Sequence, residues 1–170
     1  EKAGIATAAI DHRDFDGRAP FEDALHAELT RAGVELVCLA GFMRLLTEQF
    51  VERWFDRMIN IHPSLLPSYK GLHTHERVLE DGVRFTGCTV HFVRPAMDAG
   101  PIIVQAAVPV LPGDTADTLA ARVLTAEHRS YPHALRLVAG GYTAITGQTV
   151  EIGDGSAPDG IWLNPDDGQS

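Results

Sequence analysis

Residues 57–67 of the chain, RMINIHPSLLP, carry the pattern that decides the fold. Side chains of a strand point alternately to its two faces, so Asn60 and His62 share one face while the intervening isoleucine points to the other. Proline donates no backbone hydrogen bond and biases the residue before it toward extended geometry, so the strand is predicted to end at His62. An amide and an imidazole therefore lie together at the carboxyl end of a strand, where open α/β sheets bind ligands.

The segments before this stretch predict further strands and helices. Residues 5–10 and 34–40 are apolar runs typical of strands, and the second is typical of a strand buried on both faces of a parallel sheet. Residues 20–33 carry apolar side chains at helical spacing, with proline near the first turn and glycine past the end. Residues 47–55 predict a second helix, with Thr47 as its N-cap. Strands that alternate with helices need crossover connections, which favour a parallel sheet.

The second half of the chain changes character. Residues 86–93 alternate in polarity and residues 101–110 form a β-rich run, and the short loop between them allows antiparallel pairing. Residues 114–139 predict a long amphipathic helix, and residues 142–152 resemble a closing hairpin. We therefore predict an α/β fold of Rossmann type, in which a mainly parallel sheet carries an antiparallel addition near the C-terminus.

Length and composition bound the class of protein. The 170 residues fit one domain, here residues 1–152, followed by an acidic tail rich in glycine and proline over residues 153–170. The formal net charge of −9 disfavours a nucleic-acid partner, because phosphate backbones need clustered lysine and arginine. The sequence contains no apolar run long enough to span a bilayer and no signal segment. Cys38 and Cys88 are too few for a disulfide framework, so we expect reduced thiols and a cytoplasmic protein.

The residue types at the end of the predicted strand suit acyl transfer. A carboxamide N–H from Asn60 and a protonated His62 can both donate to one oxygen, as the oxyanion of a tetrahedral intermediate requires. A nearby carboxylate would hold the imidazole protonated and could take a proton from an attacking amine. Asp98, in the loop between the two β-rich runs, is the candidate, although spacing alone does not choose it over Asp81 or Asp114. The plainer alternative is that Asn60 and His62 only cap the loop that follows.

The other histidines point to weaker sites. His73 and His75 could suggest a metal pair, but no third or fourth ligand stands at a recognisable spacing, so we expect no metal. Thr74 between them is as easily the N-cap of a helix over residues 76–80. His91 alternates with apolar neighbours, which is typical of a core residue whose polar atoms are hydrogen-bonded.

Three ordered motifs give the sequence a specific resemblance to a known family. Residues 60–67 read NIHPSLLP, residues 71–75 read GLHTH and residues 98–103 read DAGPII. In this order and with these gaps they resemble phosphoribosylglycinamide formyltransferases, over residues 3 to about 142. Formyltetrahydrofolate deformylases are similar, but they normally carry a second histidine where this chain has Pro63.

The resemblance implies an activity and a set of site residues. The activity is transfer of a formyl group from 10-formyltetrahydrofolate to the amine of glycinamide ribonucleotide in purine synthesis, by direct attack through a tetrahedral intermediate. The implied catalytic residues are Asn60, His62 and Asp98. The implied folate site comprises Arg18, Met43, Arg44, Leu45, Leu46, Asn60, Arg94, Pro95, Ala96, Met97 and Asp98. The implied ribonucleotide site comprises Leu124, Thr125, Ala126 and Glu127.

The sequence around these residues also allows other roles for some of them. Leu45 and Leu46 could be core residues that flank a helix, and Glu127 could lie on a solvated helix face. The expected partners are the two small-molecule substrates, with a homodimer as a possible assembly and with neither nucleic acid nor membrane. A hydrolase that releases formate from the same folate, and a folate-binding module without catalysis, are the two rival functions.

The start of the sequence departs from the family pattern. Members of the family begin with a strand and a glycine-containing loop that holds the substrate phosphate on backbone N–H groups. That loop does not occur in this sequence, so the resemblance implies that about one βαβ unit, roughly thirty residues or more, precedes Glu1.

Overall fold

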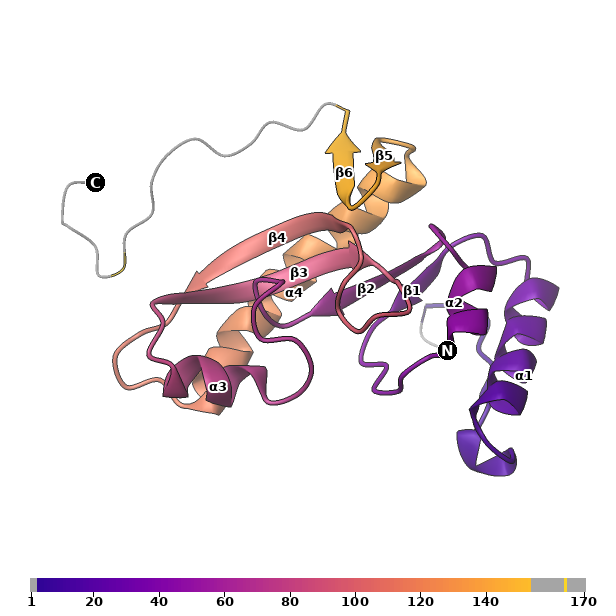
Figure 1. The fold of residues 1–170 in the computed structure, drawn as a ribbon, viewed down its shortest axis with the longest axis horizontal. Coiled ribbons are helices and arrows are strands. Elements are labelled where there is room, and N and C mark those ends of the chain that lie inside the picture. Colours follow the sequence, from indigo (N-terminus) through magenta and orange to yellow (C-terminus); the bar gives the residue numbers. More distant parts are fainter. Residues whose placement is uncertain (1–2, 154–163, 165–170) are drawn as a thin grey trace.

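The computed structural model describes residues 3–153 and residue 164 (Figure 1). Apart from Gly153 and Asn164, the expected acidic tail lies outside the described residues. None of the helices in the described ranges combines the length and the apolar character needed to cross a membrane. In chain order, the elements are η1 (His12–Asp14), α1 (Arg18–Arg31), β1 (Val37–Leu39), α2 (Glu48–Arg53), β2 (Met58–His62), α3 (Thr74–Glu80), β3 (Phe85–Phe92), β4 (Ile102–Pro109), α4 (Ala116–Ala139), β5 (Thr143–Thr146) and β6 (Thr149–Ile152).

Four strands form one sheet in the order β1-β2-β3-β4, and β5 and β6 form a separate hairpin (Figure 1). β1 and β2 are parallel and are joined through α2, as the alternation of strands and helices predicted. β3 and β4 are antiparallel across their short loop, which was also predicted. β2 pairs with β3 in the antiparallel sense as well, so the antiparallel share of the described sheet is larger than expected.

The register between β2 and β3 sets up the functional face of the sheet. Asn60 lies opposite His91, and His62 lies opposite Thr89. Directly opposite residues of an antiparallel pair share a face, so these four side chains lie on one side of the sheet. Their intervening neighbours, among them the fully buried Ile59 and Val90, belong to a hydrophobic cluster on the other side.

Helix α4 lies along β3 and β4 and fixes the end of the sheet where β2 stops (Figure 1). A hydrophobic cluster joins α3, β3 and α4 through Val78, Cys88 and Leu119, all of them fully buried. A second cluster packs α2 against the start of β2 through Phe50, Trp54 and Met58 and similar side chains. The carboxyl end of β2 therefore lies between helices that the core holds in place.

Two predictions for the N-terminal part were wrong. Residues 5–10 form no strand, because within the described residues no segment pairs with their backbone, and their side chains are mostly exposed. Apolar composition alone does not make a strand without a partner. The predicted strand over residues 34–40 shortens to β1, and it is not buried on both faces. Cys38 at its centre is exposed because β1 is the edge strand of the described sheet.

The helix starts confirm one predicted cap and correct another. The Thr47 side chain accepts a hydrogen bond from the Phe50 backbone N–H, so Thr47 caps α2 as predicted. The N-cap of α3 is His73, in the left-handed conformation with φ 56°, and not Thr74. Thr74 is instead the first helical residue, and its buried side chain packs inward.

Candidate functional site

His62 is held at the end of β2 by a backbone carbonyl. Its Nε2 lies 2.8 Å from the carbonyl oxygen of Tyr69, and the residue is only 6 % exposed. A carbonyl can only accept, so Nε2 carries the proton and donates. Nδ1 is therefore the ring nitrogen that remains for a reacting group.

Asp98 faces this second nitrogen. One carboxylate oxygen, Oδ2, lies 3.5 Å from Nδ1 of His62 and also accepts a hydrogen bond of 2.9 Å from the Gly71 backbone N–H. Asp98 has a φ of 48°, a left-handed conformation that aspartate tolerates better than most residues. The structure thus brings Asn60, His62 and Asp98 together, as the sequence led us to expect.

The two competing aspartates have other partners or positions. Asp114 forms an ion pair of 2.7 Å with Arg122, whose guanidinium holds the pKa of the Asp114 carboxyl well below its usual range. Asp81 is the C-cap of α3. Of the three aspartates considered, Asp98 is the one that the structure places at His62.

A buried network holds the loop that follows β2. The Thr89 hydroxyl donates to the Ser64 carbonyl at 2.7 Å and accepts from the Leu66 backbone N–H at 3.0 Å. The Gln105 amide donates to the Leu66 carbonyl and to the Thr89 hydroxyl. This network fixes the chain between His62 and Tyr69, and so determines which carbonyl meets the His62 ring.

The Asn60 carboxamide lies beside His62 on the same face. Its Nδ2 is 3.5 Å from Nε2 of His91 on the neighbouring strand. His91 is 2 % exposed, and its Nδ1 is 2.9 Å from the Phe92 carbonyl oxygen. The expectation that His91 is a hydrogen-bonded core residue is confirmed.

Residues 43–46 divide between surface and core. Met43 and Leu45 are 84 % and 60 % exposed, while Leu46 packs against the cluster around Phe50. Arg18 approaches this segment from α1, and its guanidinium donates to the Leu45 carbonyl at 3.4 Å. The alternative that these leucines are core residues is therefore confirmed for Leu46 and wrong for Leu45.

The same segment is tied to the start of α2. Arg44 lies over the ring of Phe21, 5.8 Å from its centroid. The buried carboxylate of Glu22 on α1 accepts hydrogen bonds from the backbone N–H and the hydroxyl of Thr47, the residue that follows the segment. Glu22 thus fixes one end of the segment.

The loop after β3 has one anchored end. The Arg94 guanidinium is 2.5 Å from Oδ1 of Asp56 and lies over the Phe55 ring at 4.0 Å. Pro95, Ala96 and Met97 are exposed, and the loop then turns inward at Asp98. The predicted folate residues of this loop therefore differ in their availability, because Arg94 is already paired.

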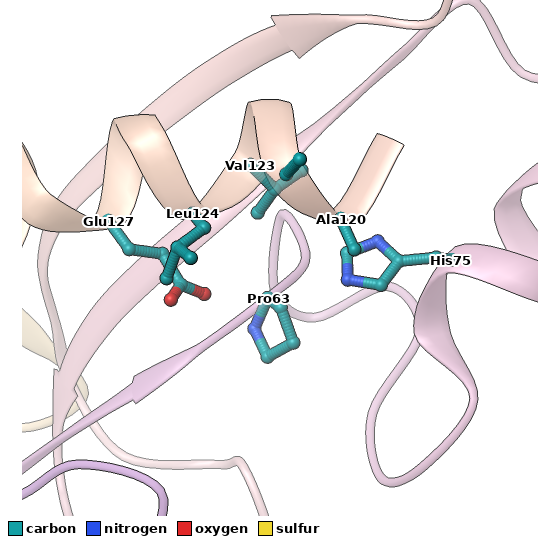
Figure 2. A pocket seen from close by; sticks show the side chains of 7 residues that line it. Pro63, His75, Ala120, Val123, Leu124 and Glu127 are labelled. Carbon is teal, nitrogen blue, oxygen red and sulfur yellow. The ribbon is translucent and has the colours of Figure 1, made fainter. Parts of the chain in front are cut away.

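A hollow of about 320 Å³ opens between the end of β2, the start of α3 and α4 (Figure 2). It is lined by Pro63, His75, Ala120, Ala121, Val123, Leu124 and Glu127. Figure 2 shows the Glu127 carboxylate and the His75 ring on opposite sides of Pro63. The hollow borders the catalytic candidates, because Pro63 directly follows His62.

Two of the four predicted ribonucleotide residues line this hollow and two do not. Leu124 and Glu127 line it, whereas the exposed Thr125 donates to the Ala121 carbonyl and Ala126 packs against the core. A helix turns about 100° per residue, so consecutive positions cannot all face one hollow. The spacing of Ala120, Val123, Leu124 and Glu127, at i, i+3, i+4 and i+7, marks the correct face and could have been found in the sequence.

Burial shifts the titration of both polar residues in the hollow. It raises the pKa of the Glu127 carboxyl, against the weaker opposing effects of His128 and His62. It lowers the pKa of His75, whose buried Nδ1 has no hydrogen-bond partner among the described residues. These groups could bind or exchange a proton with an amine or a hydroxyl of a ligand.

The two histidines considered as a metal pair have different surroundings. His73 lies 3.6 Å from Glu76 at the surface, whereas His75 turns into the hollow. Among residues 3–153 and 164, no group of three or more His, Cys, Asp or Glu side chains is placed to hold a metal ion.

The buried His91 predicts how stability depends on pH. Burial lowers the pKa of its ring below the ordinary 6.5. The Phe92 carbonyl and Asp98 raise this pKa by smaller amounts, and His62 and Lys70 lower it slightly further. The unfolded chain takes up this proton near pH 6.5 while the folded chain resists it, so stability is full above that pH and falls below it. We expect the free energy of unfolding, from urea titrations at about pH 7.5 and about pH 5.5, to fall less in His91→Gln than in the wild type. Equal losses in both proteins would contradict this assignment.

Comparison with known proteins identifies related chains. Residues 1–135 match the family described as formyl transferase. The trifunctional purine biosynthetic protein adenosine-3 of Gallus gallus is 57 % identical over 145 residues, which are 85 % of this chain and 14 % of that protein. The phosphoribosylglycinamide formyltransferase of Escherichia coli (strain K12) is 46 % identical over 140 residues, which are 82 % of this chain and 66 % of that protein.

A solved structure supports the fold class. Glycinamide ribonucleotide transformylase 1 from Symbiobacterium toebii superimposes with a TM-score of 0.87 at 48 % sequence identity, over 90 % of this chain and 72 % of that one. The predicted Rossmann-like α/β class is therefore confirmed. The chain spans 14 % of the length of the trifunctional relative and 66 % of the length of the bacterial enzyme.

Proposed function

The chain belongs to the formyl transferase family, and from that membership we propose that it transfers a formyl group from 10-formyltetrahydrofolate to the amine of glycinamide ribonucleotide, N1-(5-phosphoribosyl)glycinamide, in de novo purine biosynthesis. The observation that carries the proposal is the cluster of Asn60, His62 and Asp98 at the end of β2, next to the hollow lined by Glu127. Relatives named for this activity match most of the chain.

The reaction begins when the amine nitrogen attacks the formyl carbon. The carbonyl electron pair moves to oxygen, and a tetrahedral intermediate with an oxyanion forms. The Nδ2–H of Asn60 and the Nδ1–H of protonated His62 donate to this oxygen, since Nε2 of His62 is engaged by the Tyr69 carbonyl. Donors fixed in advance stabilise the charge without reorganising during the step.

Asp98 balances the charge and moves the proton. Its carboxylate, 3.5 Å from Nδ1, stabilises the imidazolium and is close enough to accept the proton of the attacking amine, directly or through a water. The bond between the formyl carbon and the folate nitrogen then breaks, and that nitrogen receives the proton. One carbon–nitrogen bond replaces another, and the enzyme groups return to their starting states.

Two different regions around this cluster suit the two substrates. The exposed apolar side chains of Met43, Leu45 and Met97 suit the flat ring system of the folate, and Arg18 and Arg44 suit its carboxylates. The hollow beside α4 suits the ribonucleotide, where the Glu127 carboxylate accepts hydrogen bonds from its amine or hydroxyl groups.

A turnover assay with product analysis tests the proposed function. The purified chain is given 10-formyltetrahydrofolate with and without glycinamide ribonucleotide, and both formyl transfer and formate release are measured. Transfer that depends on the amine supports the proposal. Formate release without the amine would identify a hydrolase, and folate binding without either product would identify a binding module.

Replacing Glu127 with alanine is expected to raise the KM for glycinamide ribonucleotide about tenfold or more, because a hydrogen bond to a charged group contributes about 1.5–3 kcal/mol. The KM for the folate should change little, since Glu127 lies on the ribonucleotide side. Steady-state kinetics with each substrate varied in turn measure both values. Glu80→Gln, an exposed change at the end of α3, is the control and should leave both KM values unchanged. An unchanged KM for the ribonucleotide in Glu127→Ala would move its site away from this hollow.

A further inference from the structure

His91 has a fixed relation to Asn60 that the mechanism above does not use. The two residues lie directly opposite each other on β3 and β2, and their side chains approach to 3.5 Å between Nε2 and Nδ2. The register of β3 with β4 shifts between Val90 and His91, whereas the register of β2 with β3 is regular from Ile59 to His62. This regular pairing places His91 and Asn60 on the same face of the sheet.

The contact of Nδ1 shows which nitrogen of the His91 ring carries the proton. Nδ1 is 2.9 Å from the Phe92 carbonyl oxygen, which can only accept, so Nδ1 carries the proton. Burial lowers the pKa of the ring, and His62 and Lys70 lower it further, while Asp98 and the carbonyl oppose this. The neutral ring with a proton on Nδ1 presents a lone pair on Nε2.

That lone pair selects one orientation of the Asn60 carboxamide. A carboxamide can turn either its NH₂ group or its oxygen toward a neighbour. An oxygen facing the Nε2 lone pair would place two acceptors against each other next to a buried ring, so the NH₂ group faces His91. One hydrogen of Nδ2 then points to His91, and the other remains for the reacting oxygen.

We propose that His91 is a positioning residue of this site, which holds the Asn60 carboxamide through its Nε2 lone pair and keeps one Asn60 N–H free to donate to the oxyanion. The role rests on the proposed formyl transfer, because it acts on the donor which that reaction needs. His91 itself touches neither the substrate nor the reacting atoms, and it acts through Asn60.

Kinetics of three variants test the role. His91→Leu removes the acceptor and is expected to lower kcat about tenfold with little change in the KM for either substrate. His91→Gln offers an oxygen near the position of Nε2 and should retain most of the turnover. Thr86→Val, a buried change on the same strand at a hydroxyl without a described partner, is the packing control and should leave kcat unchanged.

A double-mutant cycle separates positioning from stability. In an Asn60→Ala background, the change His91→Leu should have almost no further effect on kcat, because the group that it orients is gone. An undiminished tenfold loss in that background would overturn the proposal and assign His91 a purely structural role. So would a His91→Leu enzyme with the kcat of the wild type.

Nitrogen NMR of the histidine rings gives a readout that does not depend on activity. We expect His91, assigned by its absence in His91→Gln, to show a proton on Nδ1 and none on Nε2, and its Nε2 signal to move in Asn60→Ala. A proton on Nε2 would overturn the proposal. A chain with the expected signals but without formyl transfer would instead refute the proposed function, because the contact would then exist without that reaction.

Discussion

Replacing either Asn60 or His62 with alanine is expected to lower kcat about 10²–10³-fold, which is the typical effect of losing one oxyanion donor. Both side chains lie on one face at the end of β2, and each has one N–H that can reach the developing charge. Folate affinity should change far less, because the donors contribute mainly in the transition state. Steady-state kinetics together with a folate binding titration measure the two effects separately.

The control for these variants is His133→Ala, which removes an exposed histidine on α4 whose neighbour is Arg136. Its kcat should equal that of the wild type. A thermal unfolding curve for each variant shows whether the fold is retained. Near-normal turnover in Asn60→Ala or His62→Ala would remove that residue from the mechanism.

Asp98→Asn is expected to lower kcat about 10²-fold or more, because general acid–base groups typically contribute about 10²–10⁴-fold. The substitution removes the charge that faces Nδ1 of His62 but keeps an oxygen that can accept from the Gly71 backbone N–H. Asparagine also tolerates the left-handed conformation at this position, so the loop should keep its shape. The pH profile of kcat is measured alongside its value at the optimum.

Asp117→Asn is the matched control for Asp98→Asn, because it removes an exposed carboxylate from the first turn of α4, outside the site. It should change neither kcat nor the pH profile. If Asp98→Asn kept both the rate and the profile of the wild type, the proton would have to move through another group.

The local sequence pattern alone was enough to predict the end of β2, where the catalytic candidates Asn60 and His62 lie. Alternation along β2 and the proline after His62 fixed which side chains share a face and where the strand stops. The choice of Asp98 over Asp81 and Asp114 needed the resemblance or the fold, because spacing along a chain does not say which loop returns to β2. In this fold, β3 and β4 pair antiparallel next to β2, and the loop between β3 and β4 brings Asp98 back to the end of β2.

Other parts of the site depend on information that side-chain patterns do not carry. The partner of His62 is the Tyr69 carbonyl, and every residue has such a carbonyl. The contact between His91 and Asn60 depends on the register between β2 and β3. The apolar pattern of residues 34–40 would be the same in an edge strand and in a central strand. The exposure of Cys38 on an edge strand could therefore not be predicted from the sequence.

The Tyr131 hydroxyl on α4 donates to the Leu39 carbonyl at 2.6 Å, across 92 positions of the chain, and approaches the Ile59 carbonyl at 3.3 Å. A ribosome therefore exposes β1 and β2 well before the helix that pins them together has been synthesised. Contacts of such long sequence separation slow folding, since a large loop must close before they contribute. The link that Tyr131 makes between α4 and the first two strands therefore forms late, after α4 has been synthesised and has docked on the sheet.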